Sequence, residues 1–466
     1  MRTQRSVTMR QGKGKATAVG GYRRHRVWPL LVWLPISASY TQNSAALETR
    51  FGAALTFEHT DNIDFAPTDQ RSELVVTPRL AVGVNEDSPN FALAATAAVD
   101  YLDYTKNTYE NDHLTYVSAR AAWKPRPQRF EWRFDDFASP ATTDPFAPPT
   151  PANRQNTNIF TTGPDLFLPL TPVDTLVAGY RWGDFYYEIT NIDSNRHLLV
   201  LRWLHKVSNV TQLSLNGSAG RVDFKDPERT GDDYDRYDAF VRAEQRLGHS
   251  RLVVDAGASD ITKKESDVQE SRKFSGFLGK LDWEYQIGSD RTLNFYTAAG
   301  YSDAGRDVLT LFEAGDARPG SLEMLFAPNL TTGDLFYGKR VGVSFRQARA
   351  FVLDAIRSDE DYEEAQVSRL VTSGRAELNY AMSATLSVNL LGDYTETDQK
   401  DREQIDKDRT VVAGLLYRSR RWLTVALSAG YRERRSTNPA SEYQERRALL
   451  SIAVGEDLPG PGGGGY

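Results

Sequence analysis

The chain has 466 residues, with 56 lysines and arginines against 62 aspartates and glutamates, and it contains no cysteine. The lack of cysteine excludes a disulfide scaffold, cysteine-ligated zinc and thiol catalysis, and the acidic balance argues against nucleic-acid binding, which requires a basic face. A mean hydropathy of −0.51 argues against a helical membrane protein, because each spanning helix needs about 20 mostly apolar residues.

Residues 1–46 have the pattern of a cleaved secretory signal peptide. They carry no acidic residue, and an apolar core from Val27 to Ala38 is followed by small residues up to Ala46. Cleavage near Ala46 would begin the mature chain just before the first predicted strand. A short anchor or a disordered basic tail is the alternative interpretation. The basic residues before the apolar core are Arg2, Arg5, Arg10, Lys13, Lys15, Arg23, Arg24 and Arg26.

Runs of alternating residues, separated by turns and loops, recur from about residue 49 to residue 454. From Leu423 to Arg432, every odd position is apolar and every even position is small or polar. Successive side chains of a strand point to opposite faces, so this alternation indicates strands with one apolar and one polar face. Many such strands without a helix-length apolar run are typical of a transmembrane β-barrel, whose outside contacts lipid and whose inside is wet.

Twenty runs follow this pattern. The runs 156–168, 350–358 and 366–380 show it least clearly, and without the weaker runs the number falls to 18 or 16. The twenty runs are 49–59, 72–84, 91–104, 113–123, 129–137, 156–168, 175–188, 196–206, 210–223, 236–246, 250–261, 272–286, 291–302, 333–345, 350–358, 366–380, 384–395, 409–419, 422–434 and 443–454.

The connections between the runs alternate in length. The link after every even run is short, as at 85–90, whereas the link after an odd run tends to be longer and polar, as at 60–71. Bacterial outer-membrane barrels have short periplasmic turns, long outer loops and an even number of strands. The sequence therefore predicts an all-β fold, a transmembrane antiparallel up-and-down β-barrel of about 20 strands (16–20). This barrel spans 47–454, and a flexible Gly/Pro tail occupies 455–466.

The alternation also assigns a face to each side chain. A charged lysine or arginine facing lipid at the membrane midplane costs about 2–4 kcal/mol, so charged residues within the runs should face the interior, here called the lumen. They either form cross-strand ion pairs that hold the sheet or line a polar channel. The candidate lumen-lining residues are Arg120, Arg133, Arg181, Arg202, Arg242, Glu244, Lys280, Arg340, Arg375 and Arg432. The predicted lipid-facing residues include Phe51, Leu55, Phe57, Phe130, Trp132, Phe134, Leu293, Phe295, Leu390 and Leu415.

Three predicted loops have unusual composition. The loop 303–332 holds too many apolar residues to lie in water, so we expect it to fold inward as a constriction or to pack on a neighbour. The acid-rich loops 226–235 and 398–408 have no calcium-loop spacing and are interpreted as solvated loops. The candidate constriction residues are Leu309, Phe312, Leu322, Met324 and Phe326.

Candidate catalytic groups are few. The six histidines are scattered, and none forms a metal-like pair. His59 near Asp61 and His113 beside Asp112 lie at the predicted outer end, but no nucleophile is placed beside them. We therefore predict no catalytic residue, no metal, no cofactor and no enzyme, and a barrel hydrolase is the third and weakest hypothesis.

The first predicted hairpin resembles a known family. Thr60-Asp61-Asn62-Ile63, followed by a strand from Ser72 that reaches Thr77-Pro78-Arg79-Leu80, is similar to the opening of outer-membrane barrels encoded with exosortase (PEP-CTERM) and exopolysaccharide-export systems. Only about the first forty residues of the barrel carry the motif. The Gly-rich tail and the absence of an aromatic residue closing the last strand depart from the usual pattern. The resemblance implies a barrel that accompanies polysaccharide secretion, without catalytic residues.

These observations lead to two main hypotheses for an outer-membrane protein of a Gram-negative cell. The first is a porin-like barrel for exopolysaccharide export, in which arginines orient a hydrated, often anionic polymer. The second is a plugged structural or binding barrel that anchors surface components. The expected partners are outer-membrane lipids and lipopolysaccharide, the barrel-assembly machinery, and in the first case polysaccharide and the export machinery. We expect no nucleic acid as a partner.

Overall fold

The computed structural model describes residues 47–144, 147–226, 232–264, 271–303, 335–348, 350–363, 368–419 and 422–455. The chain divides into two units, 1–44 and 45–466, and all of the described residues belong to the second. In this part of the chain no helix is long and apolar enough to cross a membrane.

The described residues form twenty strands and three short 3-10 turns. The strands are β1 (Glu48–Thr60), β2 (Glu73–Ser88), β3 (Phe91–Tyr104), β4 (Asp112–Arg126), β5 (Phe130–Ala141), β6 (Gln155–Pro169), β7 (Asp174–Tyr187), β8 (Ser194–Lys206), β9 (Thr211–Phe224), β10 (Tyr234–Leu247), β11 (Ser250–Lys263), β12 (Arg272–Ile287), β13 (Arg291–Ser302), β14 (Phe336–Gln347), β15 (Phe351–Tyr362), β16 (Ser368–Ala381), β17 (Leu386–Gln399), β18 (Gln404–Ser419), β19 (Leu423–Ser436) and β20 (Tyr443–Gly455). The 3-10 turns are η1 (Pro151–Asn153), η3 (Lys400–Arg402) and η4 (Pro439–Ser441).

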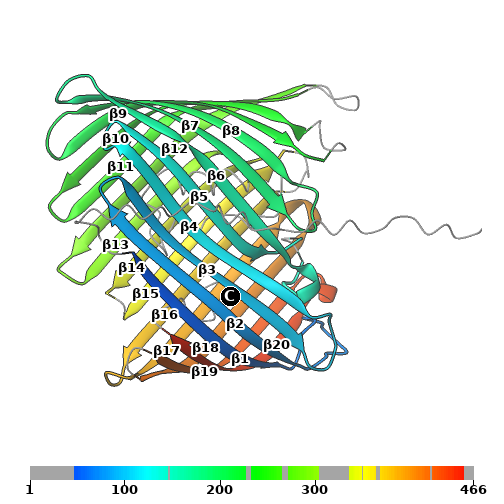
Figure 1. The fold of residues 1–466 in the computed structure, drawn as a ribbon. Helices are drawn as coiled ribbons and strands as arrows, with labels where there is room; N and C mark the ends of the chain where they lie inside the picture. The colour runs from blue at the N-terminus through cyan, green and yellow to red at the C-terminus, as the bar shows by residue number, and fades with distance from the viewer. Residues whose placement is uncertain are drawn as a thin grey trace, which may run out of the picture. The chain divides into compact units, whose positions relative to one another are not determined.

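Each strand pairs antiparallel with the next, and β20 returns to pair with β1. The ladder between β1 and β20 runs from Gly52 opposite Gly455 to Thr60 opposite Arg447, which closes the sheet into a cylinder. Figure 1 shows the tilted strands of this barrel. The predicted fold class, an antiparallel all-β barrel of about twenty strands, is confirmed, and the three runs with the weakest pattern form strands β6, β15 and β16.

The acid-rich loop predicted at 398–408 is wrong. Strand β17 continues to Gln399 and β18 begins at Gln404, so only the turn η3 separates them. The backbone pairing of β17 with β18 continues through this stretch, with Thr395 opposite Asp408 and Thr397 opposite Asp406. Apart from Ile405, both faces of this extension are polar, so the apolar alternation disappears although the backbone hydrogen bonds continue. Alternation therefore marks the part of a strand in contact with lipid, not the whole strand.

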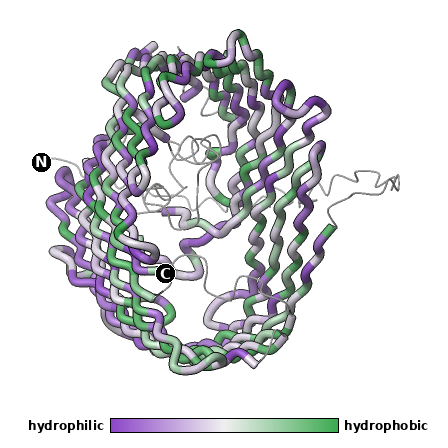
Figure 2. Tube along the Cα trace, turned by 90° about the vertical axis from the view of Figure 1, so that its left-hand side faces the viewer, coloured by the Kyte–Doolittle hydropathy of each residue, from purple (hydrophilic) through white to green (hydrophobic). Residues whose placement is uncertain are grey.

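The outward face carries an apolar band. The register places Leu55, Ile452 and Pro78 side by side, and the same face continues around the barrel through exposed apolar residues such as Phe51, Leu80 and Leu415. Hydrophobic and hydrophilic residues alternate along the strands in Figure 2. All of the residues predicted to face lipid lie on this outward face. Exposed aromatic residues next to the short turns, which suit the membrane interface, include Trp123, Trp203, Tyr285, Tyr417 and Trp422.

Candidate functional site: the inner wall of the barrel

The register places all ten candidate lumen-lining residues on the inward face. Arg120, for example, lies between Ala119 and Ala121, which share the outward face with Phe134. The same alternation, followed through each ladder, puts Arg133, Arg181, Arg202, Arg242, Glu244, Lys280, Arg340, Arg375 and Arg432 on the inner wall.

Two of these arginines present their charge to the lumen and hold a carboxylate in the wall. Arg120 Nε donates to Asp135 Oδ1 over 3.0 Å, and its side chain is 43% exposed against 4% for Asp135. Arg242 donates from Nε and Nη2 to both oxygens of Asp255 at 2.7 Å, and the exposed fractions are 34% and 5%. In both pairs the guanidinium is the solvent-exposed partner and the carboxylate is the buried one.

Two further candidate pairs lie within single strands. Arg133 Nε donates to Glu131 over 2.7 Å, and Arg375 Nη2 donates to Glu377 over 3.0 Å. Both arginines remain partly exposed on the inner wall. Because residues i and i+2 share one face of a strand, the spacing of two residues is enough to form these pairs.

Glu244 is the acidic residue among the candidates. It accepts hydrogen bonds from Arg246 Nε at 2.8 Å and from Arg251 Nε at 3.4 Å. One carboxylate therefore lies between two guanidinium groups near the short-turn end of β10 and β11.

Arg181 also faces inward, but its charge is buried. Its Nη2 donates to Asp165 Oδ2 over 2.5 Å, and both side chains are less than one-tenth exposed. Its Nη1 donates to the carbonyl oxygens of Pro164 and Tyr180, where the ladder between β6 and β7 is interrupted. Proline has no N–H to give to a ladder, so the guanidinium satisfies carbonyl groups that the backbone leaves without a donor. Arg181 therefore stabilises the contact between β6 and β7 within the barrel wall.

Four candidates lie against the inner wall in other ways. Lys280 lies 5.7 Å from the Tyr296 ring centre, and Arg340 lies 5.6 Å from that of Phe336. Arg432 lies 5.5 Å from the ring centre of Phe65. Such contacts hold a cation on an aromatic face, and Arg340 Nε and Nη2 are buried there. The fourth is Arg202, which is opposite Asn216 in the ladder of β8 and β9.

A buried ion pair that the sequence analysis missed joins β8 to the end of β13. Arg196 Nη1 donates to Asp303 over 2.9 Å, and the Tyr234 hydroxyl donates to the other carboxylate oxygen over 2.5 Å. The Arg196 guanidinium also lies 4.4 Å from the Phe185 ring centre. Asp303 follows β13 directly and appeared in the sequence as the first residue of a loop, so the pattern held no signal for this contact.

The inner face of β19, β20, β1, β2 and β3 carries many small side chains, which alternate with ion pairs such as Arg79–Asp100 and Arg447–Glu58. By strand order in the closed barrel, this arc lies across the lumen from β9–β13, which hold Arg242, Asp255 and Lys280. Among the described residues, these small side chains add little bulk to the lumen. The inward residues of the arc include Gly52, Ala54, Ala81, Gly83, Ala92, Ala94, Ala98, Ala426, Ser428, Ser451 and Ala453.

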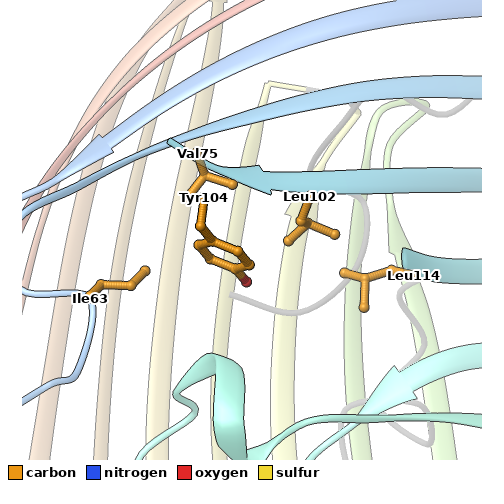
Figure 3. Close-up of a cluster of buried hydrophobic side chains, with 5 residues drawn as sticks. All are labelled: Ile63, Val75, Leu102, Tyr104 and Leu114. Atoms are coloured by element: carbon orange, nitrogen blue, oxygen red, sulfur yellow. The ribbon is translucent and has the colours of Figure 1, made fainter. Parts of the chain in front are cut away.

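The first outer loop folds over the inner rim of the barrel. Figure 3 shows Ile63 of this loop near Val75, Leu102, Tyr104 and Leu114, which point inward from β2, β3 and β4. Two residues further along the same loop, the Phe65 ring lies 4.9 Å from the ring of Tyr443 on β20. The loop thus spans the inner rim from β20 to β4. The predicted constriction residues Leu309, Phe312, Leu322, Met324 and Phe326 lie outside the described residues.

The motif Thr60-Asp61-Asn62 holds the closing ladder at its outer end. Asp61 exchanges two hydrogen bonds with the backbone of Arg446, one through its N–H and one through Oδ1. Asn62 Nδ2 donates to the carbonyl oxygens of Gln444 and Ala66, and Thr60 Oγ1 donates to Glu445. These side chains continue the pairing of β1 with β20 beyond the last residue of β1.

An ion pair outside the membrane fixes the same loop. Arg71 donates from Nε and Nη2 to the two oxygens of Asp64 at 2.5 and 2.6 Å, which holds the pKa of the Asp64 carboxyl below its usual value. The Tyr109 hydroxyl donates to Asp64 over 2.5 Å. Burial, together with this carboxylate, raises the pKa of Tyr109 to about 12.

The two histidines considered for catalysis are placed apart. His59 Nδ1 lies 3.1 Å from the Glu73 carbonyl oxygen, and His113 faces outward opposite Tyr101. Within the described ranges, no group of three or more histidine, cysteine, aspartate or glutamate residues is arranged to hold a metal ion.

The closed barrel, its apolar outer band and its charged inner wall define an outer-membrane β-barrel protein. No protein-family model and no curated protein matches this chain. Among solved structures it is similar to the outer membrane protein OpdK of Pseudomonas aeruginosa, with 9% identity and a TM-score of 0.42 over 88% of this chain and 99% of the other. It is also similar to the FrpB iron transporter of Neisseria meningitidis, with 8% identity and a TM-score of 0.46 over 88% and 82%.

Proposed function

We propose that this protein is an outer-membrane channel through which a hydrated, anionic polysaccharide leaves the cell, working with an exopolysaccharide-export system. The observation that carries the proposal is the orientation of the inner-wall ion pairs. In Arg120–Asp135 and Arg242–Asp255, the guanidinium faces the lumen and the carboxylate is packed in the wall. An anionic polymer in the lumen would meet the cationic partner of each pair.

The pairing also sets how strongly the wall holds a polymer. A guanidinium already bonded to a carboxylate keeps donor groups for carboxylate or sulfate oxygens, but its charge is partly compensated. Binding at each position is then weak, which suits a polymer that must move on. The arc of small residues across the lumen, for example Ala81 and Ala98, adds no side chain bulk to the path.

The resemblance of the first hairpin to export-associated barrels supports the polymer as the solute. In the proposal, the partners are the polysaccharide, the export machinery on the periplasmic side, lipopolysaccharide around the barrel, and the machinery that assembles barrels.

A plugged binding barrel is the second candidate function. The first outer loop favours it, because Ile63 and Phe65 pack on the inner rim from β4 to β20 and occupy part of the outer mouth. A plugged barrel would stay silent in a planar bilayer, whereas a channel conducts in discrete steps.

The test is single-channel recording with polysaccharide on one side of the bilayer. We expect stepwise conductance that polygalacturonate, an anionic polysaccharide, interrupts more often than neutral dextran of the same size. In the variant R120Q/R242Q, the difference between the two polymers should shrink while the steps remain. A conducting barrel that treats both polymers alike would contradict the proposed solute, and a silent barrel would favour the plugged form.

A further inference from the structure

Three exposed arginines lie on the outward face at the outer ends of β18, β19 and β20. Arg409 and Arg446 are the first charged residues beyond the apolar band on β18 and β20, and Arg435 lies further out on β19. We call Arg409, Arg435 and Arg446 the outer arginine patch. Each lies an even number of residues along its strand from an exposed apolar residue, so they share its face. These apolar residues are Val411, Leu427 and Leu450.

The arc of the barrel that carries the patch is described through its outer end. Residues 368–419, 422–455 and 47–144 include the outer loop between β17 and β18, the one between β19 and β20, and the one between β1 and β2. The contacts of the patch with its neighbouring strands and with the loops beyond it are therefore visible.

Two of the three guanidinium groups have no carboxylate partner among the described residues. The Arg409 guanidinium lies 5.9 Å from the Tyr394 ring centre, and the side chain of Arg446 is exposed. Arg435 donates from Nε to Glu433 over 2.7 Å, but its side chain is 64% exposed against 10% for that of Glu433. All three arginines therefore keep N–H donors for a ligand that approaches from outside the barrel.

The backbone of Arg446 is fixed by the motif Thr60-Asp61-Asn62. Asp61 Oδ1 accepts a hydrogen bond from the Arg446 N–H over 2.7 Å, and the Asp61 N–H donates to the Arg446 carbonyl oxygen over 3.2 Å. The carboxylate of Asp61 is thus directed at the backbone of the arginine. The motif holds Arg446 in place at the outer end of the closing ladder.

The carboxylates that lie beside the patch are bonded to other groups. Glu433, opposite Arg409 in the register, is the buried partner described above. Glu396 lies opposite Lys407, whose Nζ is 3.5 Å away, and it accepts from the Tyr394 hydroxyl over 2.7 Å. Neither carboxylate forms an ion pair with Arg409, so its positive charge remains uncompensated at the surface.

The opposite side of the barrel differs at the corresponding position. On β9 the first charged outward residue beyond the apolar band is Arg221, which donates from Nε to Asp223 over 2.8 Å. On β7 the first charged outward residue is Asp184, which forms an ion pair with Lys225. The arginine on this side already has an anionic partner, and the outer arginine patch is therefore a local feature of β18–β20.

A phosphorylated lipid matches the patch in charge and in position. Arginine forms strong charge-assisted hydrogen bonds with phosphate oxygens. The apolar band directly below the patch suits acyl chains. Strands β18 and β20 are two strand spacings apart, about 10 Å, so Arg409 and Arg446 can bind separate phosphates of one headgroup. In the outer leaflet of an outer membrane, such a lipid is lipopolysaccharide, whose lipid A carries phosphates on a disaccharide above several acyl chains.

We propose that the outer arginine patch binds the phosphate groups of the lipid A part of lipopolysaccharide. Arg409 and Arg446 donate to the phosphates, Arg435 adds its exposed donors from above, and the acyl chains lie on the apolar face of β18–β20. The site holds one lipid at a fixed position beside the closing ladder of the barrel. It does not depend on the solute that the channel carries.

Native mass spectrometry of the full barrel in detergent micelles, titrated with lipid A that carries both phosphates, tests the proposal. In R409Q/R446Q, which removes two charges and keeps polar side chains of similar length, we expect the dissociation constant for lipid A to rise at least fivefold. R221Q is the matched control, because Arg221 has the corresponding position on β9 but is paired with Asp223. The control should change the constant less than twofold. All variants are first checked for the heat-modifiable gel mobility of a folded barrel.

A second probe separates the phosphates from the acyl chains. Lipid A from which both phosphates have been removed keeps every acyl chain. The wild-type barrel should bind this probe at least fivefold more weakly than the phosphorylated form, and R409Q/R446Q should bind the two forms alike.

Equal affinity of the wild-type barrel and R409Q/R446Q for phosphorylated lipid A would overturn the proposal. An equal loss in R221Q would also overturn it, because the effect would then come from surface charge in general. A wild-type barrel that does not distinguish the two forms of lipid A would show that apolar contact alone holds the lipid, which contradicts a phosphate site.

Discussion

The inner wall contains two sets of ion pairs that look alike in sequence and differ in exposure. In Arg120–Asp135, Arg242–Asp255 and Arg375–Glu377, the guanidinium is substantially exposed to the lumen. In Arg181–Asp165 and Arg196–Asp303, both partners are buried and the arginine also bonds a backbone carbonyl or contacts an aromatic ring. The first set can meet a solute. The second set holds the wall together.

The difference follows from what surrounds each arginine. Arg181 fills an interruption that Pro164 creates in the ladder, and Arg196 binds an aspartate that the end of β13 brings to it. Arg120 and Arg242, in contrast, lie in regular stretches of their ladders and keep an exposed guanidinium. A regular ladder is not sufficient for exposure, because Arg369–Glu360 is buried in the regular ladder of β15 and β16.

The largest expected effect comes from breaking a buried pair. Arg196→Leu leaves Asp303 buried without its cation and should destabilise the barrel by about 3–5 kcal/mol, because the burial cost of the carboxylate is no longer offset. Urea unfolding in lipid vesicles measures this. The matched control is Arg375→Leu, for which an exposed pair predicts a loss of about 0–1 kcal/mol. Equal losses of unfolding free energy in the two variants would contradict the distinction between the buried and the exposed ion pairs.

A large change in ion selectivity, with little loss of stability, is expected from the lumen-facing set. R120Q/R242Q removes two exposed cations while glutamine still donates to the buried carboxylates, so the preference for anions should decrease. Reversal potentials under a salt gradient measure the preference. If selectivity stays at the wild-type value, these arginines do not define the path of ions.

A moderate effect is expected on the small-residue arc. Ala98→Trp adds bulk on the inner face of β3 and should lower the single-channel conductance without altering the ion preference. Ala97→Trp, one residue away and facing lipid, should leave the conductance unchanged. A conductance lowered equally by both variants would point to distortion of the strand instead of narrowing of the lumen.

The smallest effect concerns pH and the first outer loop. Because Arg71 lowers the pKa of Asp64 in the folded loop, this pair stabilises the loop above the unfolded pKa of the carboxyl, and the contribution is lost as pH falls through the lower, folded pKa. Hydrogen exchange at the Ile63 amide, which donates to the Arg71 carbonyl oxygen, should therefore report weaker protection in acid. Asp64→Asn should show the weak protection already at neutral pH, and a variant that keeps the wild-type pH dependence would contradict the assignment.

The strand count and the faces were predictable because contact with lipid on one side and water on the other imposes a period of two. This alternation is lost where a strand extends beyond the apolar band, as in the polar continuation of β17 and β18 from Thr395 to Asp408. Arg120 and Arg181 had equal standing in the sequence, since both face inward. Their difference depends on Pro164 and on contacts between strands, which alternation does not encode.

Contacts between elements that are distant along the chain were likewise beyond the sequence pattern. The link from Arg196 to Asp303 depends on where the end of β13 lies relative to β8, and no local residue pattern marks that position. Only Ile63 and Phe65, apolar residues in a polar loop, gave a hint that the first outer loop packs against the inner rim.

The central claim is that the lumen is an open path whose exposed cations are arginines of the inner wall. The most direct test is the reversal potential of single wild-type channels under a potassium chloride gradient, compared with R120Q/R242Q. The claim predicts stepwise currents with a preference for chloride that declines in the variant. Silent membranes, or a wild-type channel that prefers potassium, would contradict it.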